Sequence, residues 1–122
     1  MNWTFLVIIA VVVAIFLTVS KAGQISAKDA AAYLKNGALV IDVRSPGEFN
    51  SGHLTNAMNI PLDEIAAVVP QRWPDHGRVL LLHCASGMRS GMAQKKLKAL
   101  GYTNTFNLGS YGRAESLLRQ RP

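Results

Sequence analysis

The sequence has 122 residues, of which 49% are apolar and 16% are charged, and its formal net charge is +6 at pH 7. This length excludes two catalytic domains, because about 100 residues, the usual size of one compact domain, remain after the apolar N-terminus. The single cysteine excludes an intramolecular disulfide and a multi-cysteine metal site. The three histidines show no helical i, i+4 pairing, so no metal site is expected.

The positive charge lies entirely in the part of the chain that begins at Lys21, since no Lys, Arg, Asp or Glu precedes that residue. Such a surface favours anionic partners, which include small oxyanions, acidic lipid headgroups, an acidic protein and nucleic acid. Nucleic acid is the least favoured, because the basic residues are dispersed apart from Lys95, Lys96 and Lys98. These three lie on a predicted helix and are typical of a solvated face.

The N-terminal segment is uncharged over residues 1–20, and between Trp3 and Val19 only two side chains carry a hydroxyl group. Twenty helical residues span about 30 Å, which matches the hydrocarbon core of a bilayer. A soluble helix would need a polar face, and this segment has none. We therefore expect a transmembrane anchor over residues 1–20 and a single domain over residues 21–122.

A cleaved signal peptide is the alternative interpretation of this segment. Signal peptides begin with basic residues and end in a small-x-small site, whereas here the first charge is Lys21 and Ser20-Lys21-Ala22 is a poor cleavage site. Lys21, Lys28 and Lys35 follow the apolar run. By the positive-inside tendency they predict a single-pass membrane protein with its domain in the cytoplasm.

The pattern of the domain alternates between strands and helices. A short strand around Gln24-Ile25 precedes a helix that Ser26 caps and Asn36-Gly37 ends. The apolar run at 38–43 is typical of a strand buried on both faces. The remaining predictions, in chain order, are a strand at 57–60, a helix at 62–69, a strand at 78–83, a helix at 90–100, a strand at 104–108 and a helix at 114–119. This alternation predicts an α/β fold with a parallel sheet covered on both faces.

The most informative stretch is VLLLHCASGMRSGMAQ at 79–94, where a buried strand ends at His83 and Cys84 follows at once. Ligands of open parallel sheets bind at the carboxyl ends of the strands. A loop that curls into a helix N-terminus can direct the amides of Ala85 to Arg89 toward one point, which creates an anion cradle. Gly87 permits a positive φ there and Arg89 adds a positive charge, so we expect a lowered pKa for the Cys84 thiol.

The alternative for Cys84 is a small buried apolar side chain at the end of a strand, which is common for lone cysteines. The glycines, the arginine and the strand-loop-helix context favour the reactive thiol. Met88 and Met92 lie one helical turn apart, and this spacing predicts apolar packing or a hydrophobic lip on the pocket.

Residues 41–65, IDVRSPGEFNSGHLTNAMNIPLDEI, together with HCASGMRS at 83–90, resemble the rhodanese family. That family carries Asp-x-Arg, Glu-Phe, Gly-His, Asn-Ile-Pro and Cys-x-x-Gly-x-Arg in this order, and the resemblance covers residues 24 to about 110. It implies a three-layer α/β sandwich around a parallel sheet of about five strands. It also implies that Cys84 is the nucleophile. The active-site loop that it implies consists of Ala85, Ser86, Gly87, Met88 and Arg89.

The same resemblance implies that Asp42 and Arg44 border the catalytic loop and support it. A local ion pair between Arg44 and Glu48, four residues on, is an equally good interpretation of that arginine. For His53 the resemblance implies a packing and hydrogen-bonding role, not that of a general base.

The activity implied is transfer of a sulfane sulfur from thiosulfate or a persulfide, through a persulfide on Cys84, to a thiol, cyanide or protein-cysteine acceptor. Neither step needs a metal or organic cofactor. One alternative is a cysteine-dependent phosphatase or arsenate reductase, but those enzymes place five residues between cysteine and arginine, whereas four separate Cys84 from Arg89. Another is a non-catalytic, membrane-tethered rhodanese-like module that binds a partner or senses oxidants through Cys84.

Overall fold

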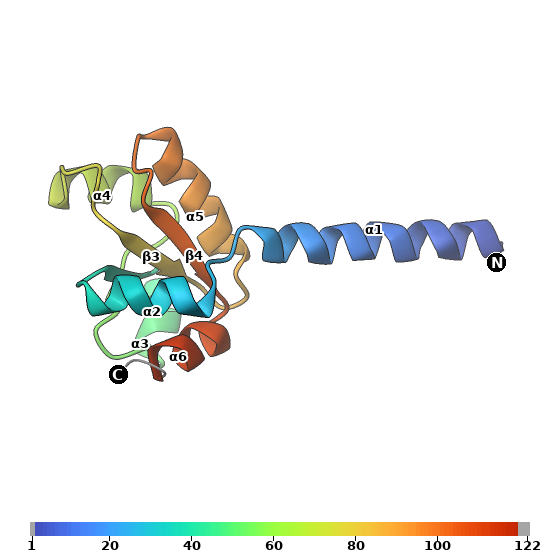
Figure 1. Cartoon of the computed structure of the whole chain (residues 1–122), viewed down its shortest axis with the longest axis horizontal. Coiled ribbons are helices and arrows are strands. Elements are labelled where there is room, and N and C mark those ends of the chain that lie inside the picture. The colour runs from blue at the N-terminus through green and yellow to red at the C-terminus, as the bar shows by residue number, and fades with distance from the viewer. Residues whose placement is uncertain (1, 120–122) are drawn as a thin grey trace.

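The computed structural model describes residues 2–119, except for the side chains of residues 17–22. Four parallel strands form one sheet in the order β2-β1-β3-β4, and helices lie on both of its faces (Figure 1). The strands are β1 (Leu39–Asp42), β2 (Met58–Asn59), β3 (Leu80–His83) and β4 (Thr105–Gly109). The helices are α1 (Trp3–Ala22), α2 (Ala27–Lys35), α3 (Pro46–Asn50), α4 (Ile65–Arg72), α5 (Met88–Ala99) and α6 (Tyr111–Arg119).

The core is divided by the sheet into two layers, because successive side chains of a strand point to opposite faces. In β3, Leu80 and Leu82 pack on one face with Ile65 and Val69 of α4 and with Leu97 of α5. On the other face Leu81 packs with buried apolar residues of α2 and α6. The three-layer α/β sandwich with a doubly covered parallel sheet is therefore confirmed.

The expected fifth strand is wrong for the described part of the chain. Gln24 makes only an isolated parallel bridge to Asn107, and the Ile25 amide donates to the carbonyl of Asn107 at 2.9 Å. The next residue, Ser26, already caps α2 by accepting from the Asp29 amide at 3.1 Å. Because the cap turns the chain into a helix at this point, the pairing stops after one residue.

A short helix, α3, was not predicted, although its start signal is present in the sequence. Ser45 and Glu48 form a capping box in which each side chain bonds the backbone amide of the other residue, and Pro46 follows the cap. This helix matters for function, because it places Glu48 beside the loop that follows β3.

The N-terminal helix α1 extends away from the domain (Figure 1), and its described apolar side chains, from Trp3 to Phe16, are exposed. Among the described residues, no helix combines the length and the apolarity that a membrane crossing requires. The transmembrane anchor predicted at 1–20 therefore stays a prediction.

Candidate active site

The strands β1 and β3 end side by side, with Asp42 opposite His83 in the parallel register. Cys84 follows His83 at this carboxyl edge, and its amide donates to the carbonyl of Gly109 at 3.3 Å. The Tyr111 amide donates to the carbonyl of Ala85 at 3.2 Å. The predicted position of Cys84 directly after a buried strand is thus confirmed, and the start of its loop is held by the end of β4 and the start of α6.

Part of the predicted cradle of amides from Ala85 to Arg89 is observed around the sulfur of Cys84. The Gly87 amide donates to Cys84 Sγ at 2.9 Å, and the Ser90 hydroxyl lies 3.4 Å from the same atom. Gly87 has a φ of +98° and an alanine Cβ there would lie 3.3 Å from Gln24 Nε2, so both the backbone and the space favour glycine. α5 begins at the next residue, Met88, and its N-terminal turn therefore faces the sulfur.

The pKa of the Cys84 thiol is lowered from its usual 9.0. Burial raises this pKa, but hydrogen bonds from the Ser90 side chain and from the amides of Ser90, Gly87 and Ser86 lower it by more in sum. Ser90 was missed as a site residue in the sequence analysis. Its signal is its place in the first turn of α5, three residues after Gly87, where a short hydroxyl can reach back to the loop.

The Cys84 residue has no exposed surface in this state. The sulfur is therefore covered in the resting state, although the Gly87 amide and the Ser90 hydroxyl point at it. Beside it lies a hollow of about 440 Å³ that Ser86, Gly87 and Met88 help to line.

In the part of the chain that the structure describes, Arg89 makes no hydrogen bond to the sulfur and instead forms a two-point ion pair with Glu48 of α3. The distances are 2.6 Å from Nη1 to Oε1 and 2.9 Å from Nη2 to Oε2. The Arg89 pair and the Ser45 amide lower the pKa of the Glu48 carboxyl to about 2. The alternative pairing of Arg44 with Glu48 is wrong, because Glu48 binds the arginine of the active-site loop.

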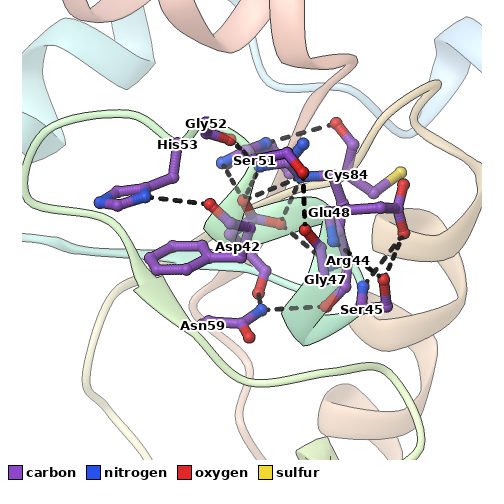
Figure 2. Close-up of polar contacts among 12 residues, drawn as sticks. Asp42, Arg44, Ser45, Gly47, Glu48, Ser51, Gly52, His53, Asn59 and Cys84 are labelled. Atoms are coloured by element: carbon purple, nitrogen blue, oxygen red, sulfur yellow. Dashed lines mark hydrogen bonds and ion pairs between the residues drawn. The ribbon is translucent and has the colours of Figure 1, made fainter.

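Arg44 is held by Asp42, with Nη2 2.7 Å from Oδ2 and Nε within hydrogen-bond distance of both carboxylate oxygens. Both residues are buried. Arg44 Nη2 also donates to the carbonyl of Gly52 at 2.7 Å, and the guanidinium lies 4.8 Å from the ring centroid of Tyr111. Figure 2 shows the hydrogen bonds that join Arg44 to Asp42 and to Gly52. The role of this pair in supporting the catalytic loop stays a prediction.

His83 is fully buried directly before the cysteine. Its Nδ1 lies 3.3 Å from the carbonyl oxygen of Cys84, which is an acceptor only, so Nδ1 carries the proton of this contact. Nε2 lies 3.7 Å from Asp42 Oδ2 and has no hydrogen-bond partner among the described residues. Burial lowers the pKa of His83, which favours the neutral ring.

His53 is exposed and lies on the segment after α3. Its ring stacks on Phe49 with 3.9 Å between centroids, and Nδ1 lies 3.1 Å from the carbonyl oxygen of the same residue. The predicted packing role is confirmed. Among the residues that the structure describes, no group of three or more His, Cys, Asp and Glu side chains could hold a metal ion.

The profile of the rhodanese-like domain matches residues 26–112, which include the whole sheet and the loop after β3. The chain belongs to the rhodanese-like domain family. This finding confirms the resemblance that the sequence motifs indicated.

Two relatives with sulfurtransferase names show how far the rhodanese similarity extends. Thiosulfate sulfurtransferase PspE of Escherichia coli is 36% identical over 69 residues, which cover 57% of this chain and 66% of PspE. The thiosulfate:glutathione sulfurtransferase of Saccharomyces cerevisiae is 33% identical over 78 residues, which cover 55% of this chain and 56% of that protein. The chain therefore spans just under two thirds and about half of the lengths of these relatives.

Solved rhodanese structures match over most of their own lengths. A rhodanese with anions from E. coli superposes with a TM-score of 0.60 at 32% identity, covering 63% of this chain and 91% of the other. The human single-domain sulfurtransferase TSTD1 superposes with a TM-score of 0.63 at 28% identity, covering 80% of this chain and 96% of TSTD1. Both similarities support the rhodanese fold described above.

Proposed function

We propose that this rhodanese-like chain is a sulfurtransferase that carries a sulfane sulfur as a persulfide on Cys84. The observation that carries the proposal is the set of donors around one sulfur: the Gly87 amide at 2.9 Å and the Ser90 hydroxyl at 3.4 Å from Sγ. Donors held in place before the reaction stabilise a thiolate and, after it, the anionic outer sulfur of a persulfide. Asp42 and Arg44 support this arrangement from the neighbouring strand end.

The first step is attack of the Cys84 thiolate on the outer sulfur of thiosulfate. The new S–S bond forms as the bond between the two sulfurs of thiosulfate breaks, and sulfite leaves with that electron pair. The products, Cys84–S–S⁻ and sulfite, carry the same total charge as the reactants. In the second step cyanide or a thiolate attacks the outer sulfur, and the electron pair returns to Cys84 as thiolate. The names of the relatives support thiosulfate as donor and glutathione as one acceptor to test.

Access of the donor requires motion of the loop, because Cys84 is covered in the resting state. The hollow that Ser86, Gly87 and Met88 help to line would provide space for the donor and for the transferred sulfur atom once the loop moves. The residues Ala85 to Arg89 would then hold the anion through their backbone, as the loop geometry favours.

Phosphate chemistry is less well supported. The four residues between Cys84 and Arg89 form a smaller loop than a tetrahedral oxyanion needs, and the Arg89 guanidinium is already paired with Glu48 at 2.6 Å. A single persulfide sulfur needs neither the longer loop nor a free arginine.

The test uses the full chain in a mild detergent, treated with thiosulfate and measured by intact mass. The expected result is a gain of one sulfur atom, its loss to cyanide as thiocyanate, and neither change in Cys84→Ser. Absence of sulfur loading in a folded wild-type chain would refute the proposal. Hydrolysis of an aryl phosphate that depends on Cys84 would establish the phosphatase alternative instead.

We further propose that α1 anchors the domain in a membrane, with the domain on the cytoplasmic side. The support is an exposed apolar surface from Trp3 to Phe16, for which water is a poor environment, and the lysines at positions 21, 28 and 35, which follow the uncharged segment 1–20. Resistance of the full chain to carbonate extraction from membranes tests the anchor. Digestion of the domain by protease added outside intact cells would refute the orientation.

A further inference from the structure

Outside α1, the described part of the chain exposes three large apolar side chains: Met88, Met92 and Leu100 are 59%, 52% and 42% accessible. Met88 and Met92 lie one turn apart at the start of α5, whereas Leu100 follows its far end. Two exposed methionines on adjacent turns form a flexible apolar surface that adapts to irregular partners. The catalytic proposal uses the hollow that both methionines help to line, but it does not explain why their side chains are so exposed.

The two methionines lie where α1 joins the domain. Gly23 and Gln24, the residues directly after α1, line the same hollow of about 440 Å³ as Met88 and Met92. Consecutive Cα atoms are 3.8 Å apart, so the end of α1 at Ala22 is at most about 8 Å along the chain from Gln24. Figure 1 shows α1 leaving the domain beside the first turns of α5. A surface in which α1 is embedded up to its end would therefore lie close to the methionines.

The charge around the hollow suits an anionic surface. Lys95, one turn beyond Met92, is exposed and lines the hollow, and no Asp or Glu lies among its described lining residues. A lysine can lay its aliphatic stem against apolar surface while its ammonium group stays at the level of lipid phosphates. The pattern of two apolar side chains followed by a cation matches the boundary between acyl chains and headgroups.

We propose that this face, comprising Met88, Met92 and Lys95, rests on an anionic bilayer surface, with the methionines at the acyl boundary and Lys95 at the phosphates. The inference depends on the proposed anchoring of α1. Because Ser86 and Gly87 line the same hollow, the entrance to the active-site loop would open at the membrane surface. Sulfur donors and acceptors that are bound to or concentrated at that surface would then reach Cys84 most directly.

The test places a fluorescent probe at position 92 of the full chain. In a Cys84→Ser background, Met92→Cys carries an environment-sensitive fluorophore, and the matched control is Leu100→Cys at the opposite end of the same helix. Both proteins are reconstituted in phosphatidylcholine vesicles containing phosphatidylserine and doxyl-labelled lipid. We expect strong quenching and a blue shift at position 92 and little of either at position 100. Equal quenching at the two positions would overturn the proposal.

A probe at α1 separates failure of this inference from failure of the anchor. In Trp73→Phe protein, Trp3 is the only tryptophan, so its quenching by doxyl lipid reports insertion of α1. If Trp3 is quenched and the probe at position 92 is not, the docking of this face is overturned and the anchoring of α1 stands. If Trp3 is not quenched, both proposals are overturned. A probe at 92 that is shielded from iodide but not quenched by lipid indicates a protein partner or a second copy, and also overturns the proposal.

Lys95→Gln is expected to reduce the quenching at 92, and an unchanged signal would remove Lys95 from the contact.

Discussion

The Ser90→Ala substitution tests how the site lowers the pKa of Cys84. The Ser90 hydroxyl has one proton and three acceptors in reach: Asn107 Oδ1 at 2.7 Å, the Gly87 carbonyl at 3.2 Å and Cys84 Sγ at 3.4 Å. The shortest contact is to Asn107 in the resting thiol state. We expect the hydroxyl to rotate toward the sulfur when the thiol loses its proton, because hydrogen bonds to charged groups are the stronger ones.

The size of the effect follows from the difference between the two hydrogen bonds. A bond to a charged group contributes about 1.5–3 kcal/mol and a neutral one about 0.5–1.5 kcal/mol. The rotation therefore stabilises the thiolate by about 1 kcal/mol, a roughly five- to tenfold change in the ratio of thiolate to thiol. Asn107 Oδ1 still accepts from the Gly109 amide at 2.8 Å in the variant, so folding should lose only about 1 kcal/mol.

The assay is the rate of iodoacetamide alkylation against pH, which reports Cys84 alone because the chain has no other cysteine. Ser90→Ala should move the midpoint to higher pH. Below the midpoint the rate should fall only about two- to threefold, because the more basic thiolate is the better nucleophile. Ser110→Ala is the matched control, since its hydroxyl accepts from the Arg113 amide at 3.1 Å and, within the described residues, makes no hydrogen bond to the sulfur. An unchanged midpoint in folded Ser90→Ala, or an equal change in Ser110→Ala, would refute the reasoning.

The same pKa shift predicts a pH dependence of stability. The pKa of Cys84 is lowered in the folded chain, so the unfolded chain binds more protons between that folded pKa and the usual 9.0. The free energy of unfolding should therefore rise with pH across this window, as linkage requires. Ser90→Ala should show a smaller rise in urea denaturation, and an identical slope would contradict the proposed role of the hydroxyl.

Three further substitutions test the elements around the loop. Asp42→Asn leaves the buried Arg44 without its charged partner and should cost about 3–5 kcal/mol in urea denaturation; a loss below 1 kcal/mol would show that Asn replaces the ion pair. Gly87→Ala places a side chain at a φ of +98° and should abolish sulfur loading measured by mass, whereas Gly112→Ala, with nothing within 4 Å of its Cβ, should load normally. Glu48→Gln removes a carboxyl whose pKa is about 2 instead of 4.5, so the loss of stability as pH falls from 4.5 toward 2 should disappear, and its persistence would assign that loss to another group.

Local patterns predicted the strands and the position of Cys84 well, because burial on both faces requires an unbroken apolar run such as that before His83. The positive φ at Gly87 was also predictable, since a loop that curls over one atom needs it there. The start of α6 at Tyr111 instead of residue 114 was not predicted. The Ser110 hydroxyl caps this helix by accepting from the Arg113 amide, a weak signal within a segment rich in glycine.

The spacing of residues along the chain did not predict contacts between distant segments. Glu48 lies four residues from Arg44 and 41 residues from Arg89, yet it pairs with Arg89. The nearer arginine is unavailable because Asp42 holds it with three hydrogen bonds from its side chain. Competition between partners of equal charge depends on direction and burial, which spacing along the chain does not contain.

The amino-acid sequence by itself determined the α/β class, the rhodanese motifs, the lone cysteine at a strand end and the glycine that follows it. These are local properties of hydrophobic period, turn chemistry and residue order. Only the tertiary structure decided that the sheet has four strands in its described part, that Cys84 is covered, that Ser90 contacts its sulfur and that Arg89 binds Glu48. The physical reason is that burial and hydrogen bonding depend on which surfaces meet when the layers pack, and that choice is made by the whole chain.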